Sequence, residues 1–185
     1  MKIITYFLLP VLLLVVSSCK SSFTEEDRTK LITLQNQIKE QSFVFNANAV
    51  IPFNTQALNS VANDLLIRTG NSTARIHVQG DNYTLKIGEK QAVFALPFYG
   101  ERRIGGSYTN DTGFNFTAVI KDLISTMDEK KGYLSYEFRT NNKTETLNIE
   151  LQFYSLNSVK LSINSSHRTS MKYDGYIKWL EIEEK

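Results

Sequence analysis

Apolar and polar side chains alternate with a period of two along most of the chain after residue 74. The clearest stretch is 146–153, where Leu147, Ile149, Leu151 and Phe153 alternate with polar residues. Successive side chains of a strand point to opposite faces, so this pattern predicts strands with one buried and one solvated face. The other stretches of this kind are 74–78, 83–87, 92–98, 114–120, 134–138, 159–163 and 171–182.

Turn sequences separate these stretches. They are Gly80-Asp81-Asn82, Gly88-Glu89-Lys90 and Asp128-Glu129-Lys130-Lys131-Gly132. Short alternating strands joined by turns are typical of an antiparallel sheet that folds into a sandwich or a barrel. We therefore predict a mainly β protein, with an antiparallel sandwich or barrel-like sheet of about eight to ten strands.

Residues 25–41 are predicted to form a helix that precedes the sheet. Thr24 is a favourable N-cap residue, and the acidic residues that follow it suit the positive end of the helix dipole. Leu31, Leu34 and Ile38 recur at helical spacing and form a narrow apolar stripe. Because the other positions are mostly polar, we expect this helix to lie on the domain and to lead towards the N-terminal segment.

A strand and one short second helix are predicted between this helix and the alternating region. The strand covers residues 43–51 and ends at Pro52, which has no backbone N–H to donate. The second helix is indicated by apolar residues between Leu58 and Leu65 at the spacing i, i+3, i+4, i+7.

The N-terminal residues have the features of an export signal. Lys2 supplies a positive charge, and the 14 residues from Ile3 to Val16 carry none. This stretch is shorter than the roughly 20 apolar residues of a membrane-spanning helix and fits the apolar region of a signal peptide. The sequence Val16-Ser17-Ser18-Cys19 then resembles a bacterial lipobox, in which an aliphatic residue and two small residues precede the cysteine.

The lipobox resemblance implies that Cys19 carries a diacylglyceryl group and becomes the first residue of the mature chain. The alternative is an ordinary secreted protein with a chance cysteine near its cleavage site. We predict a lipoprotein signal peptide at 1–18, a lipidated cysteine and tether at 19–24, the helix at 25–41 and a single β-rich domain at 42–185. The predicted location is the cell envelope, as an outer-membrane lipoprotein on either the periplasmic or the surface face.

Composition excludes several classes of function. Among the 185 residues, 21 Lys and Arg face 19 Asp and Glu, and this balance offers no electrostatic footprint for nucleic acid. The single Cys excludes an internal disulfide, and with only two His it excludes the usual Cys/His zinc sites.

Sequence motifs point to no catalytic residue, metal or cofactor. There is no G-x-G-x-x-G, no phosphate-binding loop and no G-x-S-x-G nucleophile motif. His77 and His167 are 90 residues apart. His167 lies among serines, but a polar segment rich in serine usually forms a turn and has no catalytic role.

The most unusual stretch runs from Leu96 to Phe114. Pro97 cannot donate to a strand ladder, so we expect the chain to leave the sheet or run along its edge there. The favoured interpretation is a long loop that closes one end of the sheet, with Glu101 paired to an arginine and the tyrosine rings capping the core. The alternative is a ligand site, whose candidate residues can bind an anionic or planar group by bidentate and stacking contacts: Tyr99, Arg102, Arg103 and Tyr108.

Several blocks of sequence resemble one known family. They are Leu96-Pro-Phe-Tyr-Gly-Glu-Arg102 with the Gly-Gly-Ser-Tyr that follows, Phe114-Asn-Phe-Thr-Ala118, Asn142-Lys-Thr-Glu145, Ser165-Ser-His-Arg168 and Tyr173-Asp-Gly-Tyr-Ile177. The family is catalogued as domain of unknown function 4251 and is found in lipoproteins of the Bacteroidetes. The resemblance spans about residues 40 to 178 and implies a lipoprotein with a β architecture, but it transfers no activity or site.

Three functions are consistent with these observations. The first is a non-enzymatic, lipid-anchored envelope protein whose β domain binds an envelope protein or a small apolar or glycan ligand. The second is an envelope hydrolase or glycan-processing enzyme with a site near Arg102, Arg103 and His167. The third is a structural subunit of an envelope assembly that adds a strand to a partner through a free edge.

Overall fold

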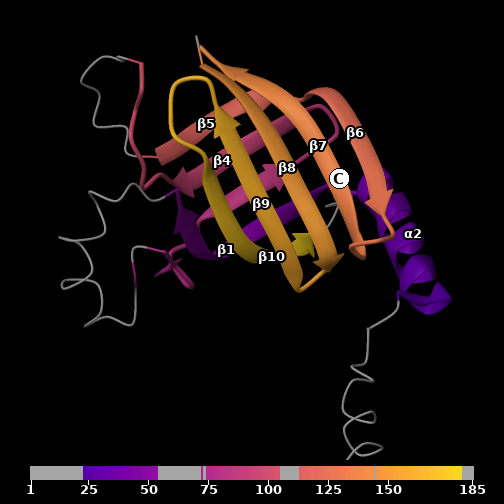
Figure 1. Ribbon diagram of the computed structural model, residues 1–185. Coiled ribbons are helices and arrows are strands. Elements are labelled where there is room, and N and C mark those ends of the chain that lie inside the picture. The colour runs from indigo at the N-terminus through magenta and orange to yellow at the C-terminus, as the bar shows by residue number, and fades with distance from the viewer. Residues whose placement is uncertain (1–22, 54–71, 73, 105–112, 144, 181–185) are drawn as a thin grey trace, which may run out of the picture.

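The protein is an antiparallel β-barrel-like sheet capped by one helix (Figure 1). The computed structural model describes residues 23–53, 72, 74–104, 113–143 and 145–180. Its helix is α2, Glu25–Glu40. Its strands are β1 Phe43–Pro52, β2 Ile76–His77, β3 Thr84–Ile87, β4 Gln91–Pro97, β5 Gly113–Val119, β6 Lys121–Asp128, β7 Tyr133–Asn142, β8 Glu145–Ser155, β9 Ser158–Ser165 and β10 Met171–Trp179.

Neighbouring strands follow the order β5-β4-β3-β1-β10-β9-β8-β7-β6, and β2 adds to β1. The two strands at the ends of this order, β5 and β6, are consecutive in the chain and are joined through Ile120. Thr140 on β7 donates a hydrogen bond from Oγ1 to the carbonyl of Val119 at the end of β5, 3.0 Å away. The sheet therefore curls round until its two edges nearly meet, and the predicted sandwich-or-barrel sheet is barrel-like.

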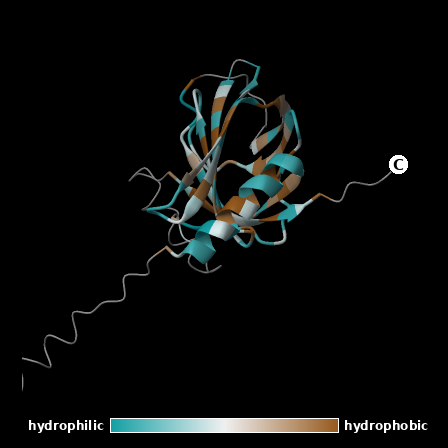
Figure 2. Ribbon diagram, turned by 90° about the vertical axis from the view of Figure 1, so that its right-hand side faces the viewer, coloured by the Kyte–Doolittle hydropathy of each residue, from teal (hydrophilic) through white to brown (hydrophobic). Residues whose placement is uncertain are grey.

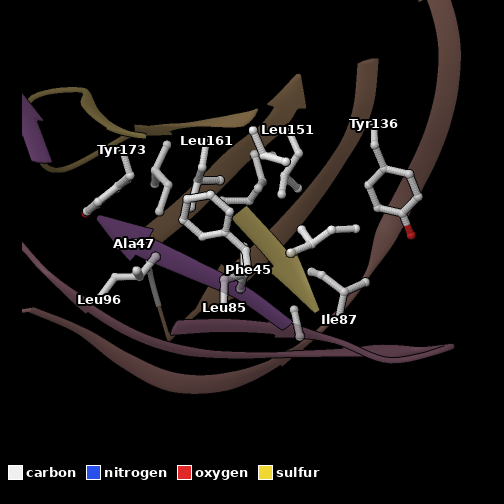
Figure 3. Packing of buried hydrophobic residues seen from close by; sticks show 14 of the residues in the cluster. Phe45, Ala47, Leu85, Ile87, Leu96, Tyr136, Leu151, Leu161 and Tyr173 are labelled. Atoms are coloured by element: carbon white, nitrogen blue, oxygen red, sulfur yellow. The ribbon is translucent and has the colours of Figure 1, made fainter. Parts of the chain in front are cut away.

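Inward-facing side chains from opposite sides of the barrel fill its interior. Phe45 and Leu85 meet Leu151 and Leu161 there, and each of these four side chains is completely buried (Figure 3). Their alternate positions along each strand match the period of two in the sequence, because successive residues face in opposite directions. The interior of the described barrel is thus a packed hydrophobic core.

Helix α2 lies across one end of the barrel (Figure 2). Thr24 caps it by accepting a hydrogen bond from the Asp27 backbone N–H, and the Asp27 side chain accepts one from the Thr24 backbone in return. The apolar stripe of Leu31, Leu34 and Ile38 joins the core of the barrel. Gln35 donates its side-chain amide to the carbonyl oxygen of Ser125 on β6, 3.3 Å away, so the helix also covers part of an edge strand.

The two ends of the barrel are built differently. At the helix end, α2 lies near the turn at 129–132 and near Tyr154 at the end of β8. At the opposite end, which we call the loop end, the segment 98–104 after β4 meets the segment 166–170 between β9 and β10 (Figure 1). Because the two ends are separate, residues at one end cannot form a common site with residues at the other.

Most of the predicted elements are confirmed, with one strand missed. The helix predicted at 25–41 is α2, and the strand predicted at 43–51 extends by one residue to Pro52. Strand β6 was not predicted because none of its residues is buried, which leaves no row of buried positions to detect. The predicted second helix falls at 54–71, outside the described residues.

Candidate functional site

The loop end is organised around Arg168, which is only 3% exposed. Its Nη2 donates to Oε2 of the buried Glu145 at 3.1 Å, and its Nη1 donates to the carbonyl of Gly113 at 2.9 Å. Its Nε lies 3.0 Å from Oε1 of Glu145 but without hydrogen-bond geometry, so the attraction there is electrostatic. One guanidinium group therefore joins β8, the start of β5 and the loop before β10.

Two phenylalanine rings enclose this charged group. The guanidinium carbon of Arg168 lies 4.7 Å from the centre of the Phe114 ring and 5.3 Å from that of Phe98. A planar cation interacts favourably with ring faces, which reduces the cost of removing it from water. Ser165 adds a hydrogen bond to Glu145, so the buried carboxylate has two side-chain partners.

Backbone hydrogen bonds fasten the segment after β4 to this cluster. Thr169 N–H donates to the carbonyl of Glu101 at 2.9 Å, and Arg103 N–H donates to the carbonyl of His167 at 2.7 Å. A Cβ at Gly100 would lie 2.2 Å from Oγ1 of Thr169, so only glycine fits this close approach. The segment 98–104 is therefore held against the loop that carries Arg168.

A groove of about 500 Å³ opens beside this cluster at the loop end. We call it the tyrosine groove, and its lining residues are Tyr83, Leu96, Pro97, Phe98, Tyr99, Gly113 and Asn115. Tyr99 is 40% exposed, and burial, followed by the influence of Tyr83, raises the pKa of its hydroxyl. At neutral pH the groove therefore presents a neutral tyrosine hydroxyl, aromatic rings and one amide side chain.

The four ligand-binding candidates do not form one cluster. Tyr99 lines the tyrosine groove, whereas Arg102 and Arg103 are exposed and do not line it. Arg102 instead pairs with Arg168 through an isolated backbone bridge. Tyr108 lies outside the described residues, as does the predicted lipidation residue Cys19.

The described segment 98–104 agrees with the interpretation of the loop as a closure, and of the two tyrosines expected to cap the core only Tyr99 is described. The segment after Pro97 does close an end of the barrel, but Phe98 packs with the buried Phe114, while Tyr99 remains 40% exposed. Arg168 and Glu145 were missed as a pair because 23 residues separate them in the sequence. Tyr83 and Asn115 were missed because each looks like an ordinary residue of an alternating strand.

His167 has a serine neighbour but no further catalytic partner among the residues that the structure describes. The hydroxyl of Ser166 lies 2.6 Å from Nδ1 of His167 and also accepts a hydrogen bond from the Thr146 backbone. Glu145 is bound to Arg168 and Ser165. Within the described ranges, no three potential metal ligands gather, and no helix is long and apolar enough to span a membrane.

The described residues define a class of protein, namely a filled, nearly closed antiparallel β-barrel with one end covered by a helix and the other closed around a buried ion pair. The chain belongs to the family described as domain of unknown function (DUF4251), whose model matches residues 25–177. A search of curated proteins finds no match. The fold brings residues of three separate sequence blocks together, because Phe98, Arg102 and Glu145 all contact the segment that carries Arg168.

Proposed function

We propose that this protein is a lipid-anchored cell-envelope protein of the outer membrane whose barrel is a non-enzymatic binding module for a glycan. The observation that carries this proposal is the tyrosine groove, with Tyr99 half exposed at its side and Asn115 within its lining. The lipobox-like sequence ending in Cys19 supports the anchor, as does the family's occurrence in Bacteroidetes lipoproteins.

The chemistry of the groove favours a sugar over an apolar ligand. The flat rings of Tyr83, Phe98 and Tyr99 offer stacking surfaces, and the Asn115 amide offers both a donor and an acceptor. A volume of about 500 Å³ accommodates one or two sugar rings. An apolar ligand would fit best inside a hollow barrel, but the described interior is occupied by buried side chains such as Phe45 and Leu151.

A binding experiment tests the groove. The purified lipidated protein in detergent is titrated with peptidoglycan fragments and with core oligosaccharides of lipopolysaccharide, using calorimetry. We expect saturable binding of at least one of these glycans, and Tyr99→Ala and Asn115→Ala each to weaken it at least tenfold. Tyr176→Ala is the matched control, because Tyr176 lies on β10 and does not line the groove. Equal affinity in all variants, or no binding at all, would contradict the proposal.

A separate experiment tests the anchor. Cells that express the protein are grown with an alkyne-tagged fatty acid, and the purified protein is examined for label. We expect label on the wild type and none on Cys19→Ser, which should also leave the membrane fraction. An unlabelled wild-type protein would favour the alternative of an ordinary secreted protein.

A hydrolase is the second candidate, and one observation favours it. His167 and the backbones of Arg102 and Arg103 come together at the loop end, where Ser166 contacts the His167 ring. If this pair were catalytic, a fluorophosphonate probe would label the wild type and not Ser166→Ala. No labelling of the wild type is the result we expect.

A further inference from the structure

A second hollow lies at the helix end, far from the tyrosine groove. It has a volume of about 300 Å³ and is bounded by Phe23, the start of α2, the turn at 130–132 and Tyr154. The Phe23 ring packs against Gly132, where an added Cβ would lie 3.4 Å from it. We call the surface formed by Phe23, Lys130, Lys131 and Tyr154 the tether face.

An aromatic and an apolar side chain are exposed at the end of β8 beside this hollow. Tyr154 is 38% exposed, and Leu156, in the turn between β8 and β9, is 39% exposed. Lysine ammonium groups lie beside the rings, with Lys160 5.2 Å from the centre of the Tyr154 ring and Lys131 5.8 Å from that of Tyr133. Tyrosines with an apolar body and a polar tip, flanked by long lysine side chains, suit the interface between a bilayer and water.

Chain length brings this face close to a membrane. Phe23 is only four residues after Cys19, so a lipid on Cys19 lies within about 14 Å of Phe23 even if the intervening chain is fully extended. Phe23 itself is part of the hollow. The loop end, formed by the segments 98–104 and 166–170, is at the opposite end of the barrel (Figure 1). An anchor at Cys19 would therefore hold the helix end closer to the bilayer than the loop end.

Charges near the tether face balance one another. Lys131 pairs with Asp128 at 3.4 Å, and Lys30 pairs with Glu26 at 2.7 Å. Arg28 pairs with Glu129 at 3.1 Å. A surface with this balance has no electrostatic preference for anionic lipid, so contact with a bilayer would depend on the apolar and aromatic groups.

We infer that the tether face rests on the envelope bilayer and contacts zwitterionic phospholipid headgroups, so that the tyrosine groove opens away from the membrane. This inference rests on the proposed lipid anchor at Cys19. It assigns the protein a fixed orientation, whereas a tether alone would leave the barrel free to rotate above the bilayer.

Depth measurements on the lipidated full-length protein test the orientation. Cys19 is the only cysteine and its sulfur is blocked by the lipid, so a cysteine introduced elsewhere is the only reactive thiol. Leu156→Cys places a fluorescent label in the turn after β8, two residues from Tyr154 of the tether face, and Arg103→Cys places the same label at the loop end. Both variants are reconstituted in phosphatidylcholine and phosphatidylethanolamine vesicles that contain a lipid with a nitroxide on its headgroup.

We expect the label at position 156 to be quenched at least threefold more than the label at position 103. Replacing a third of the lipid by phosphatidylglycerol should change this ratio by less than twofold. Adding Phe23→Ser and Tyr154→Ser to the Leu156→Cys variant should reduce the quenching while the protein still floats with the vesicles. Equal quenching at positions 156 and 103 in protein that floats would overturn the orientation and leave the anchor intact. Wild-type protein that fails to float with vesicles would overturn both.

Discussion

The two ends of the barrel are closed by opposite physical means. At the helix end, Leu31, Leu34 and Ile38 bury an apolar stripe against the core, and the ion pairs lie on the surface. At the loop end, the buried pair of Arg168 and Glu145 holds together the segments that close the barrel. A substitution in an apolar closure lowers the free energy of unfolding in proportion to the apolar area that it exposes. Removal of one partner of a buried charge costs more, because the remaining charge stays buried without compensation.

The buried pair makes the loop end rigid. Arg168 is bonded to Glu145 and Gly113 and packs between two rings, so it holds three segments in one defined arrangement. The tyrosine groove shares Gly113 and Phe98 with that arrangement. The loop end thus has a pre-formed groove, and the shape of this groove depends on a charge pair that contributes less net stability than its many contacts suggest.

The largest expected effect comes from breaking the buried pair. Arg168→Met should lower the free energy of unfolding by about 3–5 kcal/mol, because it leaves the Glu145 carboxylate buried without its cation. Urea denaturation followed by circular dichroism measures this change. A loss below about 1 kcal/mol would mean that water reaches Glu145 and that the two ends do not differ as described.

A double variant separates the cost of the unpaired charge from the cost of lost packing. Adding Glu145→Leu to Arg168→Met removes the unpaired charge, so the double variant should be more stable than Arg168→Met alone. A double variant less stable than the single one would show that packing, and not the buried charge, dominates the loop end.

At the helix end, Leu34→Ala should lower the free energy of unfolding by about 2–4 kcal/mol, since Leu34 is only 6% exposed and its removal leaves a cavity. Ile32→Ala on the same helix is the matched control, because Ile32 is 43% exposed. It should change stability by about 0.5 kcal/mol or less. Similar losses in the two variants would contradict the packing of α2 on the barrel.

The stability of the protein depends on pH through the hydroxyl of Tyr173. Its buried hydroxyl donates to the carbonyl of Pro97 at 2.7 Å, and burial raises the pKa of this hydroxyl well above its ordinary value of 10.0. Its contribution to stability is therefore complete below pH 10.0 and is lost as the pH rises above that value, because the unfolded chain releases the proton first.

Tyr173→Phe should lower the free energy of unfolding by about 1–2 kcal/mol at pH 7, through the lost hydrogen bond. It should also make the fall in stability between about pH 10 and pH 11 shallower than in the wild type. Denaturation series at pH 7, 10 and 11 measure both effects. Parallel pH profiles for the two proteins would contradict the buried, neutral state of Tyr173.

The smallest expected effect concerns the two exposed arginines of the loop. Arg102→Ala and Arg103→Ala should each lower stability by less than about 1 kcal/mol, because the loop is held by their backbone groups and not by their side chains. Thermal denaturation of both variants measures this. A larger loss would mean that these side chains help to close the core.

Much of the fold was predictable, because strands and helices leave patterns within a few neighbouring residues. The alternation of Leu147 to Phe153 with polar residues identifies a strand wherever it occurs, and β8 has the predicted buried positions. Thr24 and the stripe from Leu31 to Ile38 identify α2 in the same way. Strand β6 escaped prediction because an exposed edge strand has no buried face to mark it.

The site was predicted only in part. Tyr99 was named from an unusual loop and does line the tyrosine groove, but its partners Tyr83 and Asn115 come from other segments. No local pattern indicates that Arg168 is buried, since arginine after a serine turn is normally exposed. Its burial depends on Glu145, Gly113 and two rings that reach it only when the barrel closes.

The core-facing residues, the start of α2 and the antiparallel sheet follow from local sequence patterns, because strand and helix periodicities act over a few neighbouring residues. Only the tertiary structure decided that the sheet curls into a barrel, that Arg168 closes one end and that the groove lies beside it. Those outcomes depend on pairing between strands that are distant in the chain, and hydrophobic patterning constrains which face is buried without specifying which distant groups meet there.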